Sequence, residues 1–122
     1  MQKNPMQKRN VKNANALFSR KMRSSPTRRL AGSLSYSNIW LWALALIKNQ
    51  RLHAYTLNEK IEQKFGFLPG RIMAYVVLYK LEQEGLLASK VSKRRKYYVL
   101  SAKGKKELRA AKELMQDAAR EL

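Results

Sequence analysis

The chain has 122 residues, the size of one domain, and 45% of them are hydrophobic, which is enough for a modest core. It has no cysteine and one histidine, which excludes disulfide scaffolds, thiolate metal sites and cysteine nucleophiles and leaves zinc without its usual ligands. Since 26 lysines and arginines stand against 8 acids, the net charge is +18, and the natural partner is a polyanion: nucleic acid first, an anionic membrane surface second.

Residues 1–33 form a basic arm that holds no acid. Nine of the lysines and arginines lie there, Arg28 and Arg29 last among them, beside many asparagines, glutamines and serines. Because the arm has few apolar side chains, their burial cannot offset the loss of chain entropy on folding. We therefore expect the arm to be largely disordered, with at most a short helix from about Asn13 to Met22. A flexible tail that binds phosphates is the favoured interpretation; a mitochondrial transit peptide and a tail without a specific role stay open.

The first folded element is a helix predicted from about Tyr36 to Asn49, capped by Ser35 or Ser37. It contains nine consecutive apolar residues, 39–47, which would form about 14 Å of helix. The hydrocarbon layer of a bilayer is roughly 30 Å thick, so we expect no membrane insertion. A helix that is apolar all round is buried all round, which leaves room for a partner subunit on the side that its own domain does not cover.

A second helix is predicted from about Tyr55 to Phe65. Thr56 and Glu59 have the spacing of a capping box, and Gly66 stands where a helix ends in the left-handed conformation. A single apolar stripe with a spacing of four residues marks the inner face: Leu57, Ile61 and Phe65.

A third helix is predicted from about Arg71 to Glu84, after a tight link at Pro69-Gly70, with Gly85 as its stop. Four apolar residues form its inner face: Ala74, Val77, Leu78 and Leu81. Four others point away from that face: Arg71, Tyr75, Tyr79 and Lys80. Exposure is the favoured interpretation for Tyr75 and stays open for Tyr79.

Two strands are predicted next, Leu86–Val91 and Lys96–Leu100. Three of the four residues at the tip between them, 92–95, are basic. The tip lacks the Asn-Gly or Asp-Gly of a two-residue turn, so we expect a longer loop. Tyr97 and Tyr98 face opposite sides of their strand, so one is core and the other outward; the pattern leaves open which.

The last helix is predicted from about Ser101 to the C-terminus. Its apolar residues repeat with the spacings of a heptad and form a seam: Leu108, Ala111, Met115, Ala118 and Leu122. Two repeats are too few for an independent coiled coil, so the seam packs on its own domain or meets a partner subunit. The small core and the apolar first helix favour the partner subunit.

Helix, helix, helix, hairpin, helix is the order of a winged helix-turn-helix, a mainly α fold with a small β-hairpin. The predicted organisation is a basic arm (1–33), a winged-helix DNA-binding domain (34–101) and a C-terminal dimerisation helix (102–122). The third helix would lie in the major groove, with the hairpin along the backbone or in the minor groove. Basic residues on the arm, at the start of the third helix, on the hairpin tip and at the start of the last helix agree with this arrangement.

Residues 52–108 resemble the PadR family of winged-helix transcriptional regulators. Leu52-His53-Ala54-Tyr55 is similar to the family's L-H-G-Y, residues 75–86 to its Y-P-A-L-x-x-L-E-x-E-G-L, and residues 95–104 to its R-x-Y-Y-x-L-T-x-x-G. Ala54 replaces a glycine of the family pattern, Val76 replaces a proline, and the lead into the third helix is shifted in register. These departures leave the fold expectation unchanged and bear on the exact DNA contacts.

The resemblance implies a homodimer that binds pseudo-palindromic operator DNA, with the C-terminal helix in the interface. Some members bind small effectors at the dimer interface, and Trp40 and Trp42 could line such a site, although buried aromatic core is the favoured interpretation. Trp40 and the seam of the last helix are therefore the candidate dimer contacts.

The candidate DNA contacts include Arg71 because the N-terminal end of a recognition helix meets the base edges. A bidentate Arg–guanine pair there would be worth roughly 1–3 kcal/mol of discrimination. His53 is the one histidine, so we expect a helix cap, a backbone hydrogen bond or a phosphate contact in preference to a metal. The full set is Arg28, Arg29, His53, Arg71, Tyr75, Tyr79, Lys80, Lys93, Arg94, Arg95 and Lys96.

The favoured function is sequence-specific transcription regulation, most simply repression by occupying an operator, without a cofactor and in the cytoplasm at the nucleoid. The alternative is a non-specific architectural or chromatin-type DNA-binding protein, which the net charge and the basic arm favour. An RNA-binding accessory protein is the third hypothesis. Enzymes come last, because the sequence has no paired carboxylates in an apolar setting, no phosphate-binding glycine loop and no nucleophile–base combination.

Overall fold

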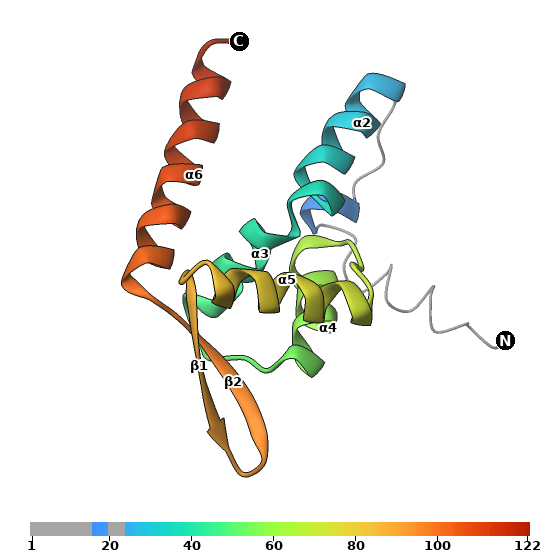
Figure 1. Cartoon of the computed structure of the whole chain (residues 1–122). Helices are drawn as coiled ribbons and strands as arrows, with labels where there is room; N and C mark the ends of the chain where they lie inside the picture. The colour runs from blue at the N-terminus through green and yellow to red at the C-terminus, as the bar shows by residue number, and fades with distance from the viewer. Residues whose placement is uncertain (1–15, 20–23) are drawn as a thin grey trace, which may run out of the picture.

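The computed structural model describes residues 16–19 and 24–122. Figure 1 shows a small helical body with a β-hairpin at one end and two helices, α2 and α6, that extend from the opposite end. The expected order of three helices, a hairpin and a helix is confirmed, and in the described residues one further α-helix, α2, precedes it. In chain order the elements are the 3-10 helix η1 (Leu17–Ser19), α2 (Ser25–Leu34), the 3-10 helix η2 (Tyr36–Asn38), α3 (Ile39–Ile47), α4 (Ala54–Phe65), α5 (Arg71–Gln83), β1 (Leu87–Ser92), β2 (Arg95–Leu100) and α6 (Ala102–Arg120).

The core lies where α3, α4 and α5 meet the base of the hairpin. The apolar run of α3 passes through it, and most of that helix is buried. The predicted stripe of α4 is buried as expected, and so are Ala74, Leu78 and Leu81 on α5, with Val77 half-buried. Helices of this length gain most of their stability from packing. The buried stripe of α4 and the buried face of α5 therefore hold the two helices in a fixed relative position.

The stretch Ser25–Ile47 is, among the described residues, the one helical segment long and apolar enough to cross a membrane by length and composition. Its two α-helices are separated by a backbone turn at Ser35, where φ is −100° and ψ is −82°. The apolar side chains of α3 are buried in the core, and α2 carries the exposed Arg28 and Arg29. Packing inside the fold therefore accounts for the apolarity of α3 without a bilayer.

Helix α2 differs from the expected largely disordered arm over the part of the arm that it covers, residues 25–33. Pro26 lies in its first turn, where the missing N–H leaves no hydrogen bond unmade. At its other end the Ser35 N–H and hydroxyl both donate to the Ala31 carbonyl, at 3.0 and 2.7 Å, so Ser35 closes α2 and does not cap the next helix. Trp42 Nε1 donates to the Leu34 carbonyl at 2.6 Å and ties α2 to the core. Most of the helix predicted over residues 13–22 lies outside the described residues.

The start of α4 differs from the predicted capping box. The helix begins at Ala54, with His53 as the residue before it, so Thr56 lies too far into the first turn to cap. Its hydroxyl donates to the His53 carbonyl at 3.2 Å instead. The cause is a short β-bridge, in which the Leu52 and Tyr98 backbones exchange hydrogen bonds of 3.2 and 2.7 Å. This bridge holds the chain beside β2 until residue 52 and makes it turn into the helix at once.

The hairpin closes more tightly than expected. β1 and β2 pair antiparallel from Leu87 opposite Leu100 to Ser92 opposite Arg95, so the predicted longer loop is wrong. Lys93 and Arg94 form a two-residue turn with φ values of +51° and +67°. Positive φ at both positions matches the twist of the strands, which explains why the turn forms without the usual glycine. Tyr98 is the buried tyrosine of β2, and Tyr97 faces outward and is half-buried.

Helix α6 starts on the base of the hairpin. The Ser101 hydroxyl accepts a hydrogen bond from the Gly104 N–H at 2.9 Å and donates one to the Gly85 carbonyl at 2.6 Å. Gly104 is buried against the Leu86 backbone, and a Cβ there would collide with the Leu86 carbonyl oxygen and lie 2.9 Å from Leu100 Cδ1.

We therefore expect Gly104→Ala to destabilise the protein by more than about 2 kcal/mol, because backbone atoms cannot move aside as a flexible side chain can. Gly32→Ala in α2 is the matched control, since a Cβ there meets nothing within 4 Å and the change should stabilise the helix by about 0.5–1 kcal/mol. Urea unfolding of the two variants measures both effects. Equal midpoints would contradict the close approach at Gly104.

Candidate nucleic-acid interface

Helix α5 is held with one face outward by its junction with α4. Gly70 precedes it with φ of +103°, a conformation that favours glycine. The Gly70 N–H donates to Asn58 Oδ1 of α4 at 2.8 Å, which fixes the turn between the two helices. The predicted outer residues are all exposed, which resolves the question left open for Tyr79: Arg71, Tyr75, Tyr79 and Lys80.

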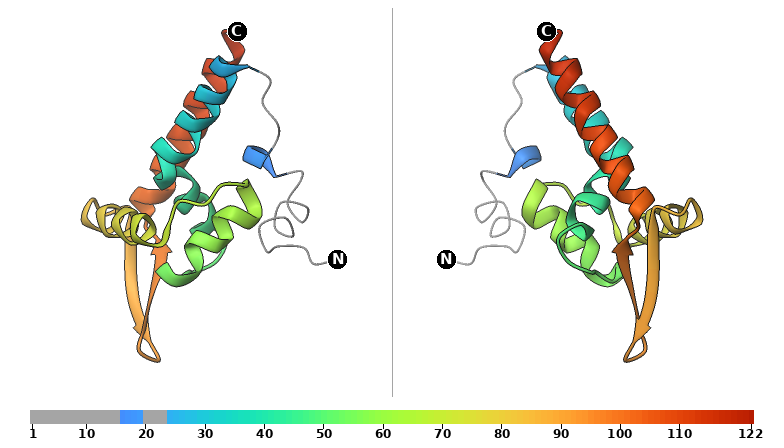
Figure 2. Two further views of the ribbon diagram at one scale, coloured as in Figure 1. Left: turned by 90° about the vertical axis from the view of Figure 1, so that its right-hand side faces the viewer. Right: turned by 90° about the vertical axis from the view of Figure 1, so that its left-hand side faces the viewer.

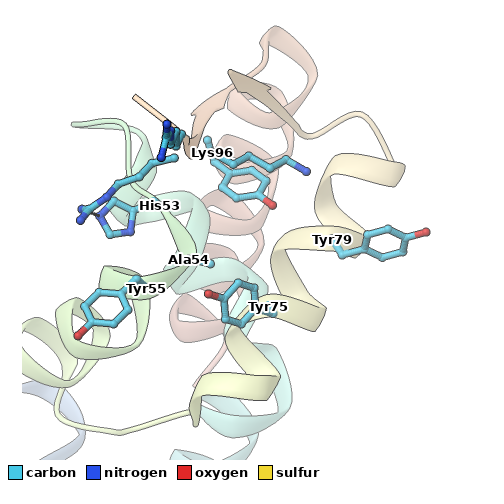
Figure 3. A pocket seen from close by; sticks show the side chains of 9 residues that line it. His53, Ala54, Tyr55, Tyr75, Tyr79 and Lys96 are labelled. Carbon is cyan, nitrogen blue, oxygen red and sulfur yellow. Dashed lines mark hydrogen bonds between the residues drawn. The ribbon is translucent and has the colours of Figure 1, made fainter. Parts of the chain in front are cut away.

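A hollow of about 610 Å³ lies between α5, the hairpin and the start of α4. We call it the α5–wing groove; its lining residues are His53, Ala54, Tyr55, Tyr75, Tyr79, Arg94, Arg95, Lys96 and Tyr98. Figure 3 shows Tyr75 reaching from α5 toward α4 and Tyr79 pointing outward from α5. Six predicted DNA contacts thus meet in one place although they are far apart in the sequence.

Tyr55 is the exposed groove residue that the predicted set of DNA contacts does not include. Its side chain is 58% exposed, and the Arg71 guanidinium lies 5.8 Å from its ring centroid. Arg51 is a cation outside the predicted set, and its guanidinium lies 4.6 Å from the ring centroid of Tyr97 at the hairpin. The available signal was the chain position of Tyr55, two residues after His53. The bridge between Leu52 and Tyr98 brings this start of α4 beside the hairpin, where it lines the groove.

His53 lies among polar and aromatic groups of the groove. Its Nε2 is 3.4 Å from Arg95 Nη1, and its ring centroid is 5.5 Å from that of Tyr97. A guanidinium can only donate, so Nε2 acts as the acceptor in this contact. The expected side-chain cap is absent, and the part of the chain that the structure describes holds no cluster of three or more potential metal ligands.

Glu82 of α5 ties both hairpin strands to the helix. Its carboxylate pairs with Lys96 Nζ of β2 at 3.0 Å and accepts a hydrogen bond from the Ser89 hydroxyl of β1. The Ser89 hydrogen bond and then that of Lys96 lower the pKa of Glu82 below its ordinary value, and the same contact with Glu82 raises the pKa of Lys96. Lys96, predicted as a DNA contact, is therefore engaged with an acid that also holds Ser89 of β1.

Lowering the pH should weaken the contacts of Glu82 with Lys96 and Ser89. A carboxyl whose pKa is lower folded than unfolded stabilises the fold above its unfolded value, near 4.5, and the contribution is lost as the pH falls through the folded pKa. At pH 7, Glu82→Gln should cost up to about 1 kcal/mol, since the pair is partly exposed. The difference in urea midpoint between wild type and variant should shrink below pH 4.5. A difference that stays constant from pH 7 to pH 3 would refute the role of the carboxylate charge.

Several predicted residues lie outside the groove. Lys93 occupies the hairpin tip, and Lys80 lines a different hollow. Arg28 and Arg29 are exposed on α2, which both Figure 1 and Figure 2 show at the end of the molecule opposite the hairpin. The structure therefore does not bring these two arginines to the groove.

The predicted dimer contacts follow α6 away from the body. Leu108 and Ala111 are half-buried against the rest of the chain, whereas Met115, Ala118 and Leu122 are exposed. The interpretation that the seam packs only on its own domain is thus wrong for its second half. Leu114 is a further exposed apolar residue of this helix, at 70%.

The two tryptophans have different surroundings. Trp42 packs against Phe18 and Phe65, with ring centroids 5.4 and 4.6 Å away, as part of the core. Trp40 is half-buried and lines a second hollow of about 430 Å³ between α3, the side of α5 away from the hairpin, and α6. Met73, Val77, Glu84 and Glu107 are among the other lining residues.

Comparison with known proteins identifies this arrangement. Residues 43–110, more than half of the chain, match the model of the transcriptional regulator PadR-like family. No curated protein matches the chain.

Solved structures of similar fold include three winged-helix proteins or regulators. A PadR family transcription regulator from hypervirulent Clostridium difficile has 21% identity and a TM-score of 0.64 and covers 68% of this chain and 92% of its own. A transcriptional regulator from Clostridium thermocellum has 18% identity and a TM-score of 0.63, with coverages of 81% and 93%. A winged-helix DNA-binding protein from STIV has 21% identity and a TM-score of 0.58, with coverages of 66% and 88%. At these identities the likeness shows the fold, a winged helix-turn-helix whose wing is the β1–β2 hairpin.

Proposed function

Because the chain belongs to the PadR-like family of transcriptional regulators, we propose that it binds double-stranded DNA in a sequence-specific manner through the α5–wing groove, as a homodimer. The observation that carries this proposal is the groove itself. The hairpin contributes cations, and α4 and α5 contribute exposed tyrosines, to one hollow beside the outward face of α5. A surface of this composition fits a phosphate backbone and the base edges next to it.

In the proposed complex α5 enters the major groove, which is wide enough for one helix. Arg71 at its N-terminal end meets a base edge, and Tyr55, Tyr75 and Tyr79 contact the sugar–phosphate backbone beside it. The wing tip, with Lys93 and Arg94, reaches the neighbouring phosphates or the minor groove. The support for this orientation is that the exposed face of α5 and the wing cations border the same hollow.

A homodimer would place two such grooves on two half-sites. The exposed part of the α6 seam supports this, because apolar side chains at heptad spacing are covered when a second helix packs on them. Both α2 and α6 extend away from the wing, so a partner subunit could join there without blocking the groove (Figure 2).

Regulation of transcription would follow from occupancy of the operator by the dimer. A dimer bound to an operator excludes polymerase, so repression at the nucleoid in the cytoplasm is the simplest outcome. The second hollow, with Trp40 on one wall and α5 on another, is the place where a small effector would alter the position of α5.

Selection of bound fragments from genomic DNA tests the proposal. We expect enrichment of a pseudo-palindromic site that binds at least about a thousandfold more tightly than a scrambled duplex at fixed salt. A non-specific architectural protein, which the charge of +18 favours, would bind both duplexes equally, and competition by structured RNA would point to an RNA-binding protein.

Arg71 should contribute to specificity more than to general affinity. We expect Arg71→Ala to cost roughly 1–3 kcal/mol on the selected site and little on a scrambled duplex. Arg71→Lys is the matched control, because it keeps the charge and loses the bidentate fork. Equal losses on both duplexes would assign Arg71 to the backbone instead.

A further inference from the structure

An apolar stripe lies on the exposed side of α5. Ile72 and Val76 lie four residues apart, and Tyr79 continues the same line, so the three share one face of the helix. Ile72 is 81% exposed, Val76 39% and Tyr79 60%. We call this stripe the crest of α5.

The crest is not the face that packs α5 into the core. Ala74, Leu78 and Leu81 provide the buried face of α5, and the wing is tied to the helix through Glu82 on another side. Exposed β-branched side chains are also not what a solvated helix surface needs, since they contribute neither charge nor helix propensity. Another molecule is therefore the natural contact of Ile72 and Val76.

The surroundings of the crest favour nucleic acid as that molecule. Exposed cations flank it, with Arg71 at the start of α5 and Lys80 beside it, and Arg94 and Arg95 line the adjoining groove. The acid nearest on the helix, Glu82, is engaged with Lys96. A protein partner of ordinary charge would gain little affinity from these flanking cations, whereas a DNA duplex would gain affinity from each of them.

On the major-groove edge of DNA, the apolar group is the C5-methyl of thymine. We propose that Ile72 and Val76 read thymine methyl groups, so that each half-site of the target carries thymines under the crest. Four residues of helix rise about 6 Å and one base step about 3.4 Å, so the two thymines lie about two steps apart. This inference rests on the proposed function, because it assumes that α5 enters the major groove.

Replacing thymine by uracil tests this directly, because the exchange removes the methyl group and keeps the base pair. On the selected site, uracil at each of the two positions should weaken binding of the wild-type protein about fourfold. With Ile72→Ala, the ratio of thymine to uracil affinities should fall to about one at the position under residue 72. Leu30→Ala is the matched control: Leu30 is 59% exposed but lies on α2, at the end opposite the wing, so this variant should keep the fourfold ratio.

The outcomes separate the two claims. Tight binding to the selected site with no response to uracil at any position would overturn the reading of methyl groups and leave the proposed function intact. A uracil effect that persists in Ile72→Ala and Val76→Ala would also overturn it, since another residue would be the reader. Failure to bind any duplex in preference to another would reject the proposed function, and this inference with it.

Discussion

Replacing Lys93-Arg94 by Asn-Gly should give a protein that is more stable and binds DNA more weakly. Both wing-tip residues have positive φ, which costs an ordinary side chain roughly 1–2 kcal/mol and costs asparagine or glycine much less. The double variant should therefore unfold at a higher urea concentration, with a gain of about 1–2 kcal/mol. It should lose at least about tenfold in affinity for the selected site, because two charge-assisted contacts disappear.

The salt dependence of DNA affinity tests this prediction more specifically than the affinity at one salt concentration. If both cations neutralise phosphates, the slope of log affinity against log salt should become shallower by about 1.8 in the double variant. Arg109→Gln with Lys112→Gln is the matched control, since it removes two exposed cations of α6 far from the groove. A stabilised Asn-Gly variant with unchanged slope would mean that the strained turn does not serve DNA binding.

Acidic substitutions in the α6 seam should separate the dimer and remove most of the DNA affinity. Met115→Glu with Ala118→Glu places two like charges at positions that are exposed in the single subunit, so the fold of each subunit should survive. A monomer binds one half-site and loses the gain from simultaneous engagement, which is typically a hundredfold or more. Sedimentation equilibrium should give twice 14.2 kDa for the wild type and 14.2 kDa for the variant.

The control for this variant adds the same charge elsewhere on α6. Ala110→Glu with Gln116→Glu changes exposed residues outside the seam, so both the dimer and its affinity for a two-half-site duplex should persist. A wild-type protein that sediments as a monomer would contradict the homodimer, and a monomeric variant with full affinity would show that dimerisation is not needed for binding.

The helices of the winged fold could be predicted because their signals are local. The stripe of Leu57, Ile61 and Phe65 marks α4, and Gly66 and Gly85 end α4 and α5 with φ values of +87° and +79°. Periodicity and glycine punctuation need no knowledge of the rest of the chain. The outward face of α5 follows from the same periodicity.

What the sequence could not predict depends on contacts between distant segments. The bridge between Leu52 and Tyr98 makes α4 start earlier than predicted and places Tyr55 at the groove. No local sequence pattern encodes the pairing of these two residues. The tight wing turn forms because the paired strands impose it on Lys93 and Arg94 against their own preference. Lys96 looked like a free cation because its partner, Glu82, lies on another element.

The central claim is that the outward face of α5 and the wing together contact duplex DNA. Titration of the isotope-labelled protein with its selected site, followed by amide chemical shifts, tests it residue by residue. We expect the largest changes in α5, in β1 and β2 and at residues 53–55, with little change in the exposed second half of α6. Changes confined to the basic arm, with α5 and the wing unaffected, would contradict the claim.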